Sequence, residues 1–253
     1  MKKKTVITIS AVAAFAAVTT AGICLKKFSE LSNNLPEYFT VTAHTGCENT
    51  KDNSLESISA GADAGADIVE IDLHFMPDGT PVLCHDKPEN NSTDESLPSL
   101  ESAFLRLSEL DIRMNVDVKS VENISSVFPL AEKYGVAEKI FFTGVNEEFV
   151  PAIRKDAPEI RYYLNVSVDK KKKADKDYID SLVEKVKSCG AVGINLHFKG
   201  CSKKLVDAFR KEGLLVSVWT ANKKSEMYYC LSLAPDNITT RYPSQLISLI
   251  SRK

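Results

Sequence analysis

Hydrophobic and polar residues alternate along this chain in a regular series of short strands and amphipathic helices. From residue 39 onward, runs rich in β-branched and aromatic residues are separated by segments with helical periodicity. The predicted strands are 39–44, 67–73, 112–118, 139–144, 159–167, 191–198, 214–220 and 237–241. Predicted helices include 54–65, 99–107, 178–189, 203–213 and 242–253. Ser202 stands where a helix N-cap is expected, and Gly190 and Gly213 stand where helices are expected to end.

Eight apolar strands, each followed by a helix, predict an α/β fold with a closed parallel sheet. Strands this apolar have no solvent-facing side, which favours a (β/α)₈ TIM barrel. The structural rival is an open doubly wound sheet, which normally has a glycine-rich phosphate-binding turn after its first strand. The corresponding segment, HTGCENT (44–50), contains one glycine. We therefore expect one barrel domain over residues 36–253.

An apolar segment flanked by lysines opens the chain. Three lysines at 2–4 precede an uncharged stretch from 5 to 25, and lysines at 26 and 27 follow it. This pattern is typical of an export signal or a single membrane anchor. Lysines on both sides favour an N-terminal hydrophobic helix retained as an anchor at 1–27, followed by a tether at 28–35. The predicted location is the cell membrane, single-pass with an extracellular domain; the alternative is secretion after signal cleavage.

The charge of the remaining domain is acidic. The first 27 residues hold five lysines and no acid, so 27 basic and 34 acidic residues remain, a formal net charge of −7. An acidic domain argues against nucleic acid as a partner.

Carboxylates occur at the ends of two predicted strands. Glu70 and Asp72 lie two apart on one strand and therefore face the same side. Asp117 lies near the end of the next strand and supplies a third carboxylate. A bound cation relieves their repulsion, and an all-carboxylate set suits Mg²⁺ or Ca²⁺ better than zinc. The alternative is that Lys119 alone neutralises the pair, without a metal.

Two histidines bracket the carboxylate pair in sequence, each at the end of an apolar run. These are His44 in VTAHTG (41–46) and His85 in PVLCHD (81–86). A single histidine in such a place is usually a core or capping residue, but two beside a carboxylate pair indicate acid–base chemistry. Cleavage of a phosphodiester needs one group to deprotonate the nucleophile and one to protonate the leaving alcohol. Lys119, two residues after Asp117, would face the same site and hold phosphate oxygens.

Several motifs together resemble the glycerophosphodiester phosphodiesterase family over the whole predicted domain. They are AHTG, DNSLES, GADIVEIDLHFMPDGTPVLCHD, NVDVKS, VSVWTAN and ITTRYP, in this order. The resemblance implies a metal-dependent TIM-barrel phosphodiesterase, related to phosphatidylinositol phospholipase C and to sphingomyelinase-D-type enzymes. By that similarity His44 and His85 match the catalytic pair. Further matches are metal ligands (Glu70, Asp72 and Asp117, where the family usually has glutamate at the last position) and substrate-pocket residues (Lys119 and Trp219).

The sequence departs from the family pattern at three places. Thr45 occupies the substrate-contacting position where an arginine usually follows the first histidine, Asp52-Asn53-Ser54 replaces Glu-Asn-Thr, and the segment after His85 is short. The short segment should leave the mouth of the barrel open. Strand eight lies beside strand one in a closed barrel, so we expect Arg241 to fill the space left by Thr45 and to contact the substrate.

A lysine run, two further histidines and Trp219 allow more than one interpretation. The run DKKKKADKD (169–177) follows the fifth predicted strand and should lie on the rim of the site. Its alternatives are a solvated loop and an attractor of anionic headgroups. His74 either borders the metal site or packs under a loop, and His197 is a possible pocket residue. Trp219 is either a core residue or a hydrophobic wall of the pocket.

The sequence thus predicts an exported metal-dependent phosphodiesterase that cleaves glycerophosphodiesters to glycerol 3-phosphate and an alcohol. Its expected partners are a small or lipid-derived glycerophosphodiester and the membrane, through the N-terminal segment. One alternative is a lysophospholipase-D-like enzyme that acts on membrane lipids. Another is a catalytically silent binding domain on the same scaffold, which the departures at Thr45 and 52–54 would favour.

Overall fold

The computed structural model of the protein describes residues 34–88 and 97–250. The predicted anchor or signal at 1–27 and most of the tether at 28–35 lie outside these residues. So do residues 89–96, in the short segment after His85. Within the described residues, no helix has both the length and the apolar character needed to cross a bilayer.

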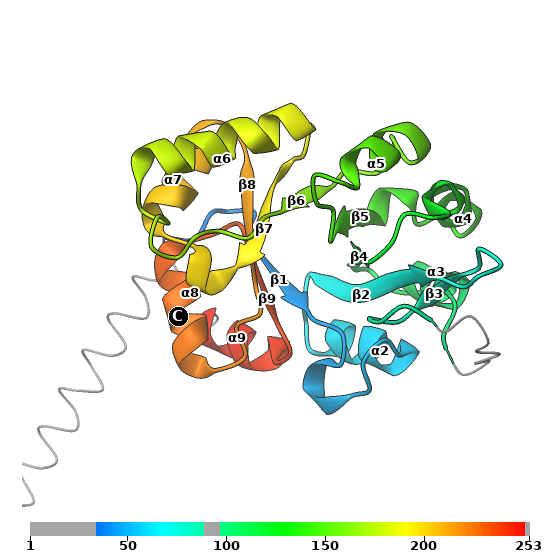
Figure 1. The fold of residues 1–253 in the computed structure, drawn as a ribbon. Coiled ribbons are helices and arrows are strands. Elements are labelled where there is room, and N and C mark those ends of the chain that lie inside the picture. The colour runs from blue at the N-terminus through cyan, green and yellow to red at the C-terminus, as the bar shows by residue number, and fades with distance from the viewer. Residues whose placement is uncertain (1–33, 89–96, 251–253) are drawn as a thin grey trace, which may run out of the picture.

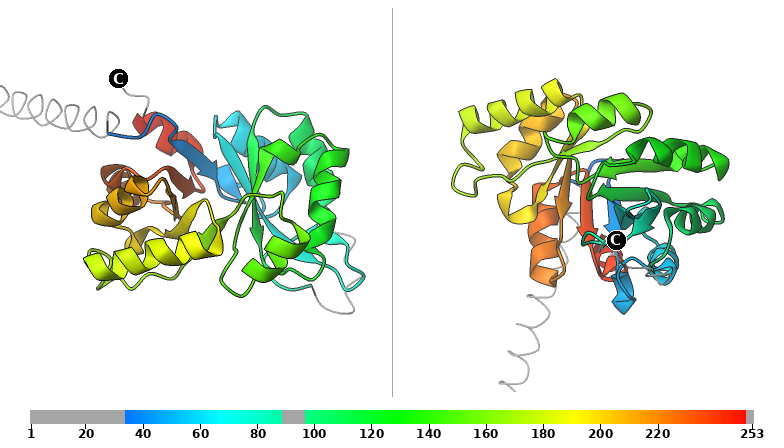
Figure 2. Two further views of the ribbon diagram at one scale, coloured as in Figure 1. Left: turned by 90° about the horizontal axis from the view of Figure 1, so that it is seen from above. Right: turned by 45° about the vertical axis from the view of Figure 1, so that its right-hand side comes forward.

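Parallel strands close into a barrel in the described part of the chain (Figures 1 and 2). The eight barrel strands are β1 (Thr40–Ala43), β2 (Ile68–Phe75), β4 (Arg113–Val118), β5 (Ile140–Thr143), β6 (Tyr163–Asn165), β7 (Gly193–His197), β8 (Leu215–Trp219) and β9 (Asn237–Thr240). They pair in the order β5-β4-β2-β1-β9-β8-β7-β6. A parallel bridge between Phe142 and Tyr162 joins the two ends. The predicted (β/α)₈ barrel is confirmed.

Helices surround the barrel (Figure 1). They are α2 (Leu55–Asp63), α3 (Leu100–Ser108), α4 (Val127–Lys133), α5 (Val150–Asp156), α6 (Lys176–Cys189), α7 (Lys203–Lys211), α8 (Lys224–Leu233) and α9 (Pro243–Ile250). Short 3₁₀ turns are η1 (Cys47–Asn49), η2 (Ile124–Ser126), η3 (Ala137–Lys139) and η4 (Phe198–Gly200). The predicted caps are found: the Ser202 hydroxyl accepts the N–H of Leu205 at 3.2 Å, and Gly190 ends α6 with φ of 67°.

The strands bury apolar side chains toward the helices and polar side chains toward the barrel axis. On β2, Val69, Ile71 and Leu73 belong to the hydrophobic core. The alternate residues Glu70 and Asp72 line a cavity at one end of the barrel. Branched apolar side chains usually fill the interior of this fold. Here the apolar core lies between the strands and the helices, and polar side chains line the interior at one end of the barrel.

A short antiparallel strand follows β2 and interrupts the alternation of strands and helices. β3 (Pro81–Leu83) pairs with the end of β2, with Leu83 opposite Leu73. Because β3 runs back along β2, it returns the chain toward Asp72. The N–H of Cys84 donates to the carbonyl of Asp72 at 3.2 Å. His85 therefore reaches the mouth of the barrel from a hairpin, rather than from the end of a barrel strand.

The fifth predicted strand is shorter than the sequence pattern indicates. Only Tyr163–Asn165 of the predicted 159–167 forms β6. A turn begins at Pro158, a residue that favours turns, and Tyr162 contributes one isolated bridge to the barrel.

Candidate active site

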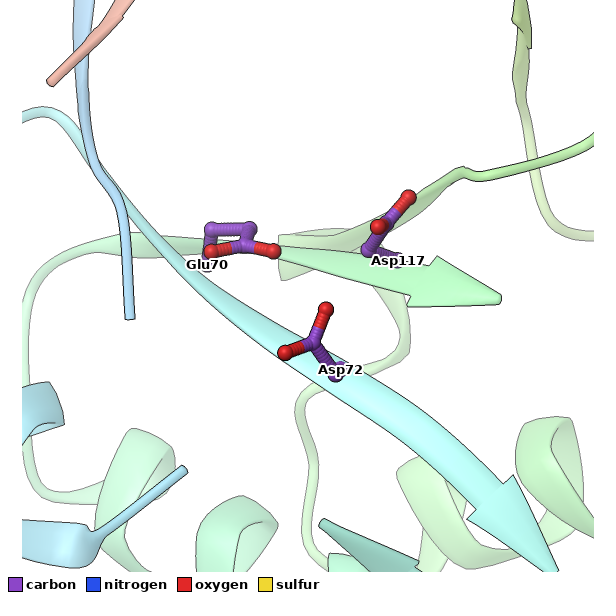
Figure 3. Close-up of side chains that lie close together, drawn as sticks. All are labelled: Glu70, Asp72 and Asp117. Carbon is purple, nitrogen blue, oxygen red and sulfur yellow. The ribbon is translucent and has the colours of Figure 1, made fainter. Parts of the chain in front are cut away.

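Three carboxylates converge from neighbouring strands β2 and β4. Glu70 and Asp72 are two apart on β2, and Asp117 on β4 stands directly opposite Asp72 in the strand register. One oxygen of each of the three residues lies within 4.8 Å of the others. Figure 3 shows the three side chains directed toward a common space. The spacing seen in the sequence thus becomes a compact acidic cluster.

The end of β5 holds the third carboxylate in place. The hydroxyl of Thr143 donates to Asp117 Oδ1 at 2.9 Å. Gly144 follows with φ of 74°, and a Cβ at this residue would lie 2.7 Å from the same oxygen. Gly144 is therefore required both by its backbone conformation and by the close approach of Asp117.

Burial makes the cluster costly without a cation. Glu70 is 6% exposed and Asp72 is 3% exposed. Burial, together with the charges of Asp72 and Asp117, raises the pKa of Glu70 well above its usual value. A hydrogen bond from the backbone N–H of Thr45 to Glu70 Oε2, at 2.8 Å, opposes this rise.

Lys119 contributes one positive charge to the cluster. Its Nζ lies 2.9 Å from Asp72 Oδ1 and 2.5 Å from Asp117 Oδ2. Burial alone would lower the pKa of Lys119, but the Asp117 and Asp72 carboxylates outweigh it and the pKa rises. Three carboxylates against one ammonium leave excess negative charge, and their oxygens form a ligand set that Mg²⁺ or Ca²⁺ prefers. The residues present fit a divalent cation.

Asn53 and Thr45 hold the carboxylates of the cluster through hydrogen bonds. The Asn53 amide donates to Asp72 Oδ2 at 2.8 Å, and its carbonyl oxygen accepts the Asp72 N–H at 2.9 Å. The Thr45 hydroxyl accepts the backbone N–H of Asn53. Thr45 is buried and forms hydrogen bonds with Asn53, with Glu70 and, through its carbonyl, with His44. The sequence predicts Thr45 among the substrate contacts; in the structure Thr45 is hydrogen-bonded to Glu70 and Asn53 and is not part of the described cavity lining.

His44 is half-buried beside the cluster. Its Nδ1 lies 2.9 Å from the carbonyl of Thr45 and 3.7 Å from Glu70 Oε2. Donation from Nδ1 to the carbonyl leaves Nε2 as the acceptor of the neutral ring. Burial, with a smaller effect of the Arg241 charge, lowers the pKa of His44, although the Thr45 carbonyl, Asp72 and Asp52 oppose this shift. The neutral ring can therefore take up a proton.

His85 lies at the solvent edge of the same site. Its side chain is 71% exposed, and Nδ1 lies 2.9 Å from Asp86 Oδ1. This contact orients the ring and leaves Nε2 free for a reacting group. The two histidines thus differ in environment, since one is half-buried against the carboxylates and the other is open to solvent.

These side chains line one cavity of about 230 Å³ at the carboxyl ends of the strands, where barrel enzymes carry out their chemistry. The cavity unites seven residues singled out from the sequence: His44, Glu70, Asp72, His85, Asp117, Lys119 and Trp219. Sequence reasoning missed the other residues of its lining: Asn115, Thr143, Asn165, Asn195, Thr220 and Thr239.

A regular spacing could have found some of the missed residues. Asn115 precedes Asp117 by two residues on β4, and Asn195 precedes His197 by two on β7. Residues two apart on a strand share a face. A polar residue repeated at that spacing inside an apolar strand therefore marks the interior of this barrel.

A larger cavity, of about 650 Å³, lies at the amino ends of the strands, with Thr40, Tyr163 and Asn237 in its lining. Neither a histidine nor a residue of the acidic cluster lines it. We therefore place the candidate active site in the smaller cavity, which the two histidines and the acidic cluster line.

Arg241 follows β9 and lies beside the loop after β1. Its guanidinium forms an ion pair with Asp52, with Nη2 3.1 Å from Oδ2. A Cβ on Gly46, the residue after Thr45, would lie 2.4 Å from Nη1 of Arg241. The guanidinium thus stands next to the Thr45 segment, and Arg241 is not among the residues that line the described cavity.

The two remaining histidines occupy different places. His74 is buried at the outer end of β2, and burial lowers its pKa. It is absent from the lining of the described active-site cavity. His197 ends β7 and lies edge-on to Trp219, with ring centroids 5.4 Å apart. Trp219 is 36% exposed and forms a wall of the cavity.

Known proteins are similar to this chain in sequence. The model of the glycerophosphoryl diester phosphodiesterase family matches residues 36–116 and 107–245. Among curated proteins, the chain is similar to a glycerophosphodiester phosphodiesterase of Caldanaerobacter subterraneus subsp. tengcongensis. The two are 21% identical over 251 residues, which cover 84% of this chain and 98% of that protein.

Solved structures share the fold. A putative glycerophosphodiester phosphodiesterase from Galdieria sulphuraria superposes with a TM-score of 0.70 at 20% identity, over 84% of this chain and 98% of that one. An Oleispira antarctica phosphodiesterase, solved in complex with the product sn-glycerol-3-phosphate, superposes with a TM-score of 0.66 at 20% identity. That match covers 87% of this chain and 98% of the other.

Proposed function

The chain belongs to the glycerophosphoryl diester phosphodiesterase family, and we propose that it hydrolyses glycerophosphodiesters to glycerol 3-phosphate and an alcohol. One observation carries the proposal: three carboxylates, Lys119 and two histidines share the lining of a single cavity. The departures at Thr45 and 52–54 favour a silent binding domain only if they disrupt this set. Instead, Asn53 supports Asp72 and Thr45 supports Glu70.

We infer that Glu70, Asp72 and Asp117 hold a divalent cation, either Mg²⁺ or Ca²⁺. One oxygen of each lies within 4.8 Å of the others, and burial, followed by the charges of Asp72 and Asp117, raises the pKa of Glu70. When bound, such a cation polarises the phosphoryl group and lowers the pKa of an attacking hydroxyl. Asn53 and Thr143 orient the two aspartates from outside the ligand set.

The two histidines move protons. We assign to His44 the removal of a proton from the attacking hydroxyl, because it is fixed by the Thr45 carbonyl beside the carboxylates. His85, oriented by Asp86 at the open edge, donates a proton to the departing alcohol. The attacking hydroxyl comes from water or from the 2-hydroxyl of the substrate glycerol. The second route passes through a cyclic phosphate.

Three further residues bind the substrate in this proposal. The Lys119 ammonium attracts phosphate oxygens while it also holds Asp72 and Asp117. Trp219 gives an apolar wall to the glycerol or the leaving group. Arg241, beside the loop after β1, still has guanidinium N–H groups to offer to phosphate beyond the two used by Asp52.

We also propose that residues 1–27 export the domain and hold it at the membrane, with secretion after cleavage as the alternative. The described chain enters β1 at its amino end, opposite to the cavity at the carboxyl ends of the strands. In this proposal the anchor joins the domain at the end opposite to the catalytic mouth. This arrangement favours water-soluble diesters over lipids embedded in the same membrane.

Product identification tests the proposed function. The full chain is incubated with glycerophosphocholine and each divalent cation, and both halves of the diester are identified. Glycerol 3-phosphate and choline support the proposal, whereas glycerol and phosphocholine contradict the proposed bond cleavage. Cleavage confined to long-chain lysolipids would support the lysophospholipase-D-like alternative. Absence of any product, with each cation and diester, would support a silent binding domain.

A further inference from the structure

A second cavity adjoins the active-site cavity. It has a volume of about 390 Å³ and lies between the segment after β6 and the end of β7. Asn165 and Trp219 line both cavities. A substrate whose phosphate lies at the acidic cluster can therefore extend past Trp219 into this second space.

Positive charge distinguishes the second cavity from the acidic domain around it. Lys170 and Lys199 line it, and no carboxylate residue belongs to its described lining. Among the described residues, neither lysine forms a salt bridge, although the Lys199 ammonium also lies 5.7 Å from the centroid of the Phe198 ring. Another lysine of the same loop is engaged elsewhere: Lys173 Nζ contacts the Tyr229 hydroxyl at 2.8 Å. Two lysines without a carboxylate partner in a salt bridge thus belong to the lining of the cavity.

His197 adds a hydrogen-bond donor to the same wall. Its Nδ1 accepts the backbone N–H of Lys199 at 3.2 Å, so the neutral ring carries its proton on Nε2. Burial and then the charges of Lys199 and Lys170 lower the pKa of His197, with only a small opposing effect of Glu226. Glu226 accepts the N–H groups of Asn222 and Lys223 at the start of α8. The charges that act on this ring therefore come mainly from the lysines.

We propose that the second cavity is the subsite for the leaving alcohol and that it selects alcohols carrying an anionic group, a phosphate or a carboxylate. This inference rests on the proposed function, because it assigns the part of the diester that departs. Lys170 and Lys199 attract the anion, the Nε2–H of His197 donates to it, and Trp219 packs against the carbon chain between the two phosphates. A quaternary ammonium group in the same place meets two like charges.

Three diesters that differ in the charge of the leaving alcohol test this subsite. They are glycerophosphoglycerol, the same diester with a phosphate on the leaving glycerol, and glycerophosphocholine. We expect the phosphorylated diester to have a kcat/KM about fivefold or more above that of glycerophosphoglycerol at low ionic strength, and glycerophosphocholine to be the poorest. Added salt should reduce the difference, since exposed charges are screened.

Replacing single lysines by glutamate tests which residues produce the preference for the phosphorylated diester. Lys170→Glu and Lys199→Glu should each remove the advantage of the phosphorylated diester, measured as the ratio of its kcat/KM to that of glycerophosphoglycerol. Lys171→Glu is the matched control, because it makes the same change in net charge on an exposed neighbour that does not line the cavity. Retained turnover of glycerophosphoglycerol shows that each variant is folded.

The outcomes separate the subsite from the catalytic function. Cleavage of glycerophosphoglycerol without a preference for the phosphorylated diester overturns the subsite and leaves the function intact. An equal loss of the preference in Lys171→Glu would also overturn the subsite, because the general positive charge of the loop would then explain the preference. If no diester is cleaved, the proposed function fails. In that case calorimetric binding tests the subsite. Tighter binding of the phosphorylated diester than of glycerophosphoglycerol, abolished by Lys199→Glu, would support the subsite. Any other result would contradict it.

Discussion

The guanidinium of Arg241 and the carboxylate of Asp52 form an ion pair across the seam between β9 and the loop after β1. The two residues are 189 positions apart in the sequence, and barrel closure brings them together. The sequence predicted that Arg241 would reach the vicinity of Thr45, and its guanidinium lies beside the adjacent Gly46. The sequence did not predict the partner, Asp52.

Replacement of Arg241 tests whether this guanidinium also binds the substrate. Arg241→Ala should lower kcat/KM by about tenfold or more, chiefly through a higher KM, the scale of a lost hydrogen bond to a charged group. Asp52→Asn is the control, because it removes the ion pair and keeps the guanidinium. Steady-state kinetics of both variants give the answer. Wild-type kinetics in Arg241→Ala would exclude a role in substrate binding.

The same ion pair predicts how stability depends on pH. The hydrogen bond from Arg241 lowers the pKa of Asp52, although partial burial opposes this shift. A carboxylate with a lowered pKa in the folded state stabilises the fold above its unfolded pKa, about 3.9. That contribution is lost as the pH falls through the folded pKa. Since both side chains are partly exposed, it should be below about 1 kcal/mol.

Urea unfolding of wild type and Asp52→Asn at pH 7 and at pH 3 measures this contribution. The wild type should be the more stable protein at pH 7, and the difference should be smaller at pH 3, where part of this contribution is lost. A difference in the free energy of unfolding that is equal at both pH values would show that the carboxylate charge is not its source.

The sequence predicts the fold and the acidic cluster well because both depend on periodicity. Alternation by two places Glu70, Asp72 and Asp117 on interior faces, and the chain order of parallel strands makes β2 and β4 neighbours. Contacts between loops follow no such rule. The support of Asp72 by Asn53 depends on how the segment before α2 folds back over β2, and the return of His85 depends on the β2–β3 hairpin. Such placements require coordinates.

Removal of Lys119 should affect metal binding and catalysis in opposite directions. The ammonium competes with a cation for Asp72 and Asp117, so Lys119→Met should bind Mg²⁺ or Ca²⁺ about tenfold or more tightly. The same variant should lose kcat/KM, because a contact to phosphate is gone. Calorimetry and kinetics measure the two effects, with Lys119→Arg as the charge-preserving control. Weaker metal binding in Lys119→Met would contradict this competition.

The histidine assignments predict different sensitivities to the leaving group. Asparagine at His44 or at His85 should each lower kcat by about a thousandfold, within the range of general acid–base catalysis. A p-nitrophenyl diester of glycerol phosphate has a leaving group that needs no protonation. His85→Asn should therefore recover most activity on this substrate, and His44→Asn should not. Recovery in His44→Asn alone would reverse the two roles.

The central claim is that Glu70, Asp72 and Asp117 hold the cation on which turnover depends. The most direct measurement titrates the chelator-treated full chain with Mg²⁺ or Ca²⁺ and follows cation binding by calorimetry and glycerol 3-phosphate release together. Wild type and the surface control Asp78→Asn should show one saturable site with activity rising in parallel, whereas Glu70→Gln and Asp72→Asn should lose both. Full activity after removal of all divalent cations, or unchanged binding in those two variants, would contradict the account.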